Sequence, residues 1–68
     1  MDKYREMARK LDLDADALNA RADGYRMAGS RDLALSAILA SKLVRQAADQ
    51  LRAMRDAEEL AQRIGELL

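Results

Sequence analysis

The sequence predicts an all-α protein: an antiparallel helical hairpin with a long C-terminal helix and a short N-terminal helix, paired into a dimeric helical bundle. Three observations support this fold class. Proline is absent, and only three glycines occur in 68 residues. Alanine, leucine, arginine, glutamine and glutamate, which favour helices, dominate the second half of the chain. Apolar residues recur at intervals of three and four, the period of an amphipathic helix.

The first expected element is a short amphipathic helix over residues 2–11, and a second helix follows over residues 15–28. Asp12 and Asp14 stand between these two elements, and Asp16 lies in the first turn of the second. Aspartate is unfavourable inside a helix because its side chain competes for backbone hydrogen bonds, and Asp14 is a good N-cap residue. We therefore place a break between the two elements.

A competing pattern runs through the same segment. Seven residues follow one another by four and three, as they would on one face of a continuous helix. A single helix over both elements is therefore the alternative. These residues are Tyr4, Ala8, Leu11, Ala15, Leu18, Ala22 and Tyr25.

The junction at Ala28, Gly29 and Ser30 predicts a turn. Gly29 suits the left-handed position that ends many helices, because glycine adopts a positive φ without steric cost. Ser30 can cap the next helix, and Asp32 favours the positive end of its dipole. We expect a short loop between two antiparallel helices.

The long helix is expected over residues 31–67, and its apolar positions fall into two phases. Between Met54 and Ala57 the step is three where four is due, which rotates the buried face. Asp56 and Glu59 have capping-box spacing there, so a fresh helix start is the alternative. The lack of nearby glycine or proline favours a continuous helix with a bend or a change of partner. The first seam is Ala40, Val44, Ala47, Leu51 and Met54, and the second is Ala57, Ala61, Ile64 and Leu68.

The second seam predicts an interface between chains. A helix of this length would run about 55 Å, whereas a compact chain of this size has a radius of gyration near 11 Å. Part of the helix must therefore pack on another chain or stand in water. We expect a homodimer, antiparallel about a two-fold axis. Its interface residues are Ala57, Leu60, Ala61, Ile64, Leu67 and Leu68.

Composition narrows the function of this single domain. Cysteine and histidine are absent, which removes disulfides, thiol chemistry, zinc sites and histidine acid–base catalysis. No nucleophile with a base and no carboxylate pair stands out, so we expect no enzyme, no cofactor and no small-molecule substrate. Twelve basic and twelve acidic residues give zero formal charge, which does not favour nucleic acid or anionic membranes. Since no membrane-spanning or signal-like segment stands out, we expect a cytoplasmic protein.

Four aspartates match positions 1, 3, 5 and 12 of a calcium loop. However, Ala17 stands where glycine makes the sharp turn, and Asn19 stands where an apolar residue is usual. We therefore expect no metal site and interpret the aspartates as helix caps. They are Asp12, Asp14, Asp16 and Asp23.

The hairpin is also compatible with a DNA-binding helix-turn-helix, with Leu35 and Ile38 packing its second helix. Tyr25 is bulky at the position, four before Gly29, where that motif packs a small residue. The second helix is also longer than a recognition helix needs. These departures and the zero net charge disfavour this interpretation.

Large and small residues alternate across the hairpin at Leu18, Ala22, Tyr25, Gly29, Ala34, Ile38 and Ser41. This spacing resembles one tetratricopeptide repeat over residues 15–46. The resemblance implies a surface that binds proteins or peptides. Arg21 and Arg31 depart from it, where leucine and an aromatic residue are typical, and Gln46 lies near the place of its closing proline. The alternative is that any tight helical hairpin needs small residues where its helices cross.

Charged residues of both signs cover the long helix. Arg45 with Asp49 and Arg52 with Asp56 lie four apart, a spacing that supports a helix by about 0.2–0.5 kcal/mol per pair. Such a surface is most often solvated.

Taken together, these features predict a small protein-protein interaction module, an adaptor or regulator that acts through helical packing on itself and on another protein. A nucleic-acid-associated regulator of the antitoxin or repressor kind is one alternative. An engineered helical scaffold without a biological function is another.

Overall fold

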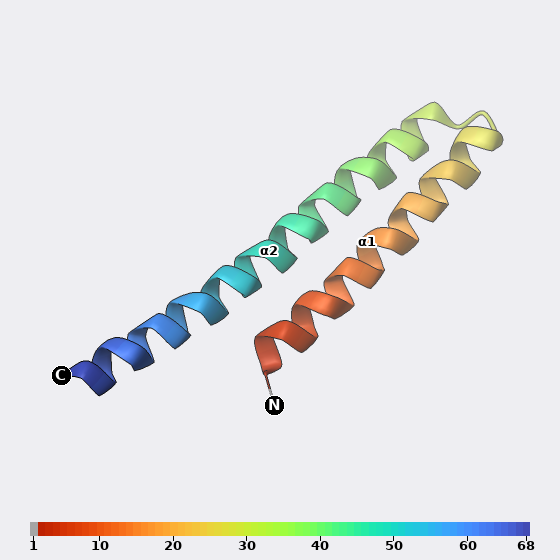
Figure 1. Cartoon of the computed structure of the whole chain (residues 1–68). Helices are drawn as coiled ribbons and strands as arrows, with labels where there is room; N and C mark the ends of the chain where they lie inside the picture. The colour runs from red at the N-terminus through yellow and green to blue at the C-terminus, as the bar shows by residue number, and fades with distance from the viewer. Residues whose placement is uncertain (1) are drawn as a thin grey trace.

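The computed structural model describes residues 2–68 and consists of two helices joined by a tight turn (Figure 1). Helix α1 spans Lys3–Met27 and helix α2 spans Arg31–Leu67. The helices pack antiparallel, and α2 continues past the start of α1 (Figure 1). This confirms the all-α hairpin with a long C-terminal helix.

The expected break after residue 11 is absent, because α1 is one continuous helix. Ala8, Ala15 and Ala22, spaced by seven residues, are buried along it. A continuous helix keeps all three on the face towards α2, whereas a break would turn some of them away. An interior aspartate costs at most about 0.7 kcal/mol relative to alanine. Tertiary packing therefore outweighs the local preference, and the prediction of two helices was wrong.

Backbone hydrogen bonds to the last turn of α1 fix the start of the turn. The Ser30 amide donates to the Tyr25 carbonyl at 2.8 Å, and the Gly29 amide donates to the Arg26 carbonyl at 3.1 Å. This is a Schellman motif, in which the residue after the helix takes a left-handed conformation. Gly29 has a φ of 81°, which confirms its expected role.

The helix starts differ in their capping. The Asp2 carboxylate accepts a hydrogen bond from the Arg5 amide at 3.1 Å and caps α1. Ser30 occupies the N-cap position of α2, but its side chain makes no capping hydrogen bond, contrary to expectation. Asp32 lies in the first turn of α2, where it favours the helix dipole.

Helix α2 runs uninterrupted through the step at Met54 and Ala57, so the continuous helix was the correct alternative. Its hairpin face is rotated from the expected first seam. Met54 is 53% exposed, and Ala40 and Ala47 are half-buried. The residues that face α1 are the buried Ala34, Ala37, Ser41 and Ala48, with the half-buried Val44, Leu51 and Arg55 in the same three-four spacing.

The core between the helices is made of small side chains. Its buried residues are alanines and one serine, and among residues 2–68 no large side chain is fully buried. Small residues let two helix backbones approach closely, towards the short end of the usual separation of about 8–10 Å. The radius of gyration is 16.9 Å, well above the value of about 11 Å for a compact chain of this length. The hairpin is therefore thin, with extents of 60 × 19 × 9 Å.

Candidate interaction surfaces

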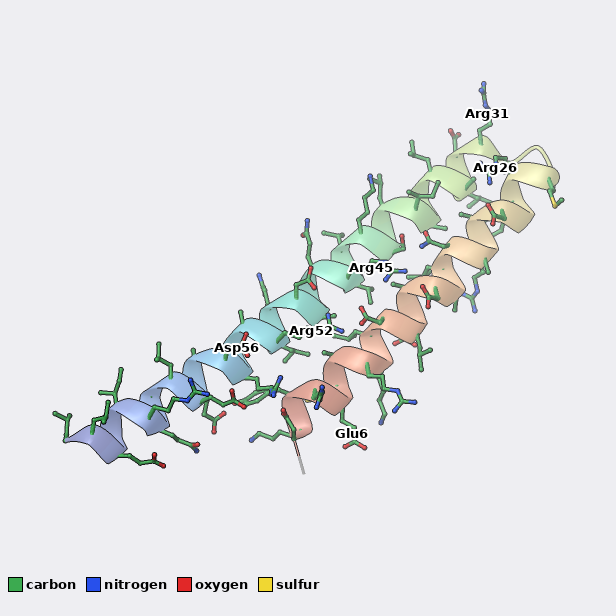
Figure 2. The ribbon with its side chains drawn as sticks, viewed as in Figure 1. Glu6, Arg26, Arg31, Arg45, Arg52 and Asp56 are labelled. Atoms are coloured by element: carbon green, nitrogen blue, oxygen red, sulfur yellow. The ribbon has the colours of Figure 1, made fainter. Side chains whose placement is uncertain are left out.

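One side of the hairpin carries ion pairs between the helices. Arg45 of α2 pairs with Asp16 of α1 and lies 4.0 Å from Asp12, while Arg52 pairs with Asp12. Figure 2 shows the Arg45 and Arg52 side chains between the two helices. Arg45 does not take its expected partner four residues along α2. Within α2, Arg52 pairs with Asp49, three residues earlier, at 3.2 Å, and not with the expected Asp56.

The hydrogen bond that Arg52 donates to the Asp12 carboxylate, and then the charges of Asp12 and Asp49, raise the pKa of the Arg52 guanidinium, while burial opposes this. A group whose pKa is raised on folding stabilises the fold at every pH below its ordinary value. The guanidinium group of arginine stays protonated throughout the physiological pH range even without such a partner. The interaction is therefore present throughout the neutral range.

A further ion pair joins the start of α1 to α2, at the end of the hairpin opposite the turn. Arg55 of α2 pairs with Asp2, the residue that caps α1. The Nε atom of Arg55 is buried and faces this carboxylate as an ion pair without hydrogen-bond geometry. The guanidinium also pairs with Glu59 at 3.3 Å. Arg55 is the last residue of α2 that is not exposed.

A polar contact lies at the centre of the hairpin. The buried Ser41 hydroxyl is 2.8 Å from Asn19 Oδ1 and 2.7 Å from the Ile38 carbonyl oxygen. Its single proton can be donated to one of these acceptors at a time. Only the contact with Asn19 joins the two helices, so it favours one register of α1 against α2, whereas the Ile38 carbonyl belongs to the same helix as Ser41.

The four aspartates of the calcium-loop pattern do not form a loop, because Asp12, Asp14, Asp16 and Asp23 all lie within α1. Asp12 and Asp16 pair with arginines of α2, and Asp23 pairs with Arg26. The described residues bring together no group of three acidic side chains able to hold a metal ion. Asp14 is mid-helix and does not act as an N-cap.

The other side of the hairpin is more apolar. Leu18 of α1 and Val44 of α2 line a shallow groove there, with Asp14, Ala17 and Arg21. Leu18 and Val44 are both only half-buried. The apolar groups on this side are therefore incompletely covered by the hairpin itself.

A second apolar pattern extends along all of α2. Starting at Leu33, its positions are spaced by three and four, and none of its eleven residues is charged. Helix α2 contains twelve charged residues, so their exclusion from this face is selective. We call this face the outer stripe. It consists of Leu33, Ser36, Ala40, Leu43, Ala47, Gln50, Met54, Ala57, Ala61, Ile64 and Leu68.

The outer stripe differs from the hairpin face. Apart from Ala40 and Ala47, all of its residues are exposed. Leu33 is 52% exposed, Leu43 66% and Ile64 50%. The two seams expected from the sequence are therefore explained by two faces. Val44 and Leu51 belong to the hairpin face, whereas the remaining residues of both seams form one outer stripe.

The six predicted interface residues lie where α2 extends past α1. Every residue from 56 to 68 is exposed, and this segment is about 18 Å of helix for residues 56–67. Leu67 and Leu68 are the most exposed, at 86% and 100%. The start of α1 lies beside Arg55, and its first residues, Lys3 and Tyr4, border this segment only at Glu58, Glu59 and Gln62. The structure thus places Ala57, Leu60, Ala61, Ile64, Leu67 and Leu68 together on the free end of α2.

Two features escaped the sequence analysis. The ion pairs between helices depend on the register of the hairpin, which the chain alone does not give. The outer stripe was visible in principle, because a three-four count started at Leu33 continues to Leu68 without a slip.

The positions that resemble a tetratricopeptide repeat lie along the closed half of the hairpin. Ala22, Ala34 and Ser41 are buried between the helices, and Leu18 and Ile38 are half-buried. Small residues at a helix crossing are required by this resemblance and by any tight hairpin alike.

Comparison of the chain with protein-family models, with curated proteins and with solved structures gave no match. Within residues 2–68, neither helix has the length of apolar sequence needed to cross a membrane.

Proposed function

We propose that this chain is a small protein-interaction module that self-associates through helix packing and serves as an adaptor or regulator of another protein. The observation that carries the proposal is the exposed free end of α2. It holds Leu60, Ile64, Leu67 and Leu68, and no residue beyond Arg55 is even half-buried. Leaving such side chains in water forgoes about 1.5–3 kcal/mol each compared with full burial.

The mode of action follows from the shape. A long, straight helix with an uncharged apolar face binds other helices by packing that face into a groove. A second copy offers the same face, and closed two-fold dimers are the commonest soluble assemblies. The same helical surfaces can then present the dimer to a further protein.

The test is the oligomeric state of Ile64→Asp. We expect the parent chain to sediment as a dimer at micromolar concentration, and the variant to sediment as a monomer that keeps most of its helical circular dichroism. Leu13→Asp is the matched control, because Leu13 is 60% exposed on α1, away from α2. It should leave the dimer intact. A parent chain that stays monomeric would contradict self-association.

Retention on heparin at low salt tests the nucleic-acid alternative with the same samples. A protein with zero formal charge should elute early. Strong retention that is lost at high salt would favour the alternative over our proposal.

A further inference from the structure

We infer that the occupant of the outer stripe is a second copy of this chain, whose α2 packs antiparallel along the first α2 from Ser36 to Leu68. This inference rests on the proposed self-association and specifies its face, direction and register. It is carried by the area that one chain leaves exposed and by the distribution of side chains along the stripe.

The exposed area of one chain fits one additional helix interface. The chain exposes 5597 Å² at a mass of 7.6 kDa, whereas a folded monomer of that mass exposes about 4,300 Å². The excess is about 1,300 Å². Stable homodimers bury about 1,000 Å² or more per partner. One second copy therefore accounts for the excess, and a contact limited to the free end of α2 would use a small part of it.

The direction follows from the position of the free end. Residues 56–68 extend past the start of α1 and are all exposed, and Leu43 is exposed in the closed half of the same stripe. In an antiparallel pair, each free end lies along the other copy's closed end. In a parallel pair, each stripe residue would meet its own equivalent, so that Leu43 would meet Leu43 and Ala61 would meet Ala61. An antiparallel pair instead lets large side chains of one copy meet small side chains of the other.

The register follows from side-chain size. In antiparallel helix pairs, the two alternating positions of a three-four stripe meet each other in layers. When Leu43 meets Ala61 of the second copy, Ala40 meets its Ile64 and Ser36 meets its Leu68. Each of these three layers combines one large and one small side chain, so the separation of the helices stays even over these layers. Layers of this kind pack without voids or overlap.

The centre of the contact differs from these layers, because two long side chains meet there beside two alanines. In this register Gln50 meets Met54 of the second copy, and Ala47 meets its Ala57. The Gln50 amide lies near the two-fold axis, where its donors and acceptor can reach polar groups of the other copy. Leu39 and Leu60, which flank the stripe and are 52% and 57% exposed, come to lie along the same edge. No like charges meet within the stripe, since it contains none.

The experiment uses disulfide formation between single-cysteine variants of the full chain. The protein has no cysteine, so each introduced thiol is unique. Leu43→Cys and Ala61→Cys chains are mixed, unfolded, refolded together and oxidised mildly. A disulfide needs Cα atoms about 4.4–6.8 Å apart, which facing positions of closely packed helices approach. We expect crosslinked dimers of the mixed kind, resolved by mass.

Each single-cysteine variant refolded alone tests whether the two helices run antiparallel. In the proposed register, Leu43 lies about 27 Å along the axis from its own equivalent, so Leu43→Cys alone should not crosslink. The matched control pair is Lys42→Cys with Gln62→Cys, each one residue from a stripe position and turned away from it. We expect this pair to give less than a tenth of the crosslinked product.

The outcomes separate this inference from the proposed function. Mixed disulfides with a sedimenting dimer support both. A dimer in which Leu43→Cys crosslinks with itself, or in which the mixed pair does not crosslink, overturns the antiparallel register and leaves self-association standing. A parent chain that is monomeric at tens of micromolar overturns both.

Discussion

Replacing Gly29 tests the turn that defines the hairpin. Gly29 has a φ of 81°, a left-handed conformation in which other residues suffer a clash between Cβ and the backbone. A Cβ placed on Gly29 meets no neighbouring atom within 4 Å. The cost of a side chain there is therefore the backbone conformation alone, with no contribution from crowding.

The magnitude can be stated for two substitutions. An ordinary residue in the left-handed conformation costs about 1–2 kcal/mol. Replacing glycine also lowers the conformational entropy of the unfolded chain, which offsets about 0.4–1 kcal/mol of this cost. We expect Gly29→Ala to lower the free energy of unfolding by roughly 1 kcal/mol. Gly29→Val, with a branched Cβ, should lower it by more than about 1 kcal/mol.

The assay is thermal unfolding followed by circular dichroism. A change of 1 kcal/mol shifts the midpoint by about 4–8 °C for a domain of this size. All samples need the same protein concentration, because association stabilises the folded state by mass action. Gly24→Ala is the matched control, since a Cβ on this helical glycine also meets nothing within 4 Å. It should raise the midpoint, because alanine is favoured over glycine by about 0.5–1 kcal/mol inside a helix.

The opposite signs of the two glycine variants make the result decisive. If Gly29→Val melts like the parent while Gly24→Ala melts higher, the left-handed turn is not formed and the hairpin is wrong.

The remaining predictions concern packing, charge and metal. Ala15→Leu should destabilise the hairpin by about 1–3 kcal/mol, because Ala15 is fully buried where the helices meet; a parent-like chemical denaturation curve would contradict this close packing. Arg52→Gln should lower the melting midpoint only slightly, since Arg52 and Asp12 are part-exposed and screened by solvent, and the difference from the parent should shrink in 1 M salt. Thermal melts with millimolar calcium and with chelator should coincide, because the aspartates of the calcium pattern lie within α1; a midpoint several degrees higher with calcium would restore them as ligands.

The sequence determined where the helices of this chain lie, with one exception. Gly29 and the absence of proline placed the turn and the single long helix 31–67, because backbone constraints of glycine and proline act locally. The exception was the break expected near Asp12. Aspartate propensity is also local, but here α2 supplies arginines that pair with Asp12 and Asp16. Helix propensity depends only on residues nearby in the sequence, so it does not include partners from a second helix.

The tertiary structure decided which face of α2 meets α1. Leu33, Leu43 and Ile64 are large and apolar, so hydrophobicity alone would bury them first. The hairpin instead buries small residues, such as Ala48 and Ser41, because small side chains let the two backbones come close. Both faces have the same three-four spacing, so periodicity cannot distinguish them. Only the pairing of α1 with α2 separates the face used within the chain from the face left for a second one.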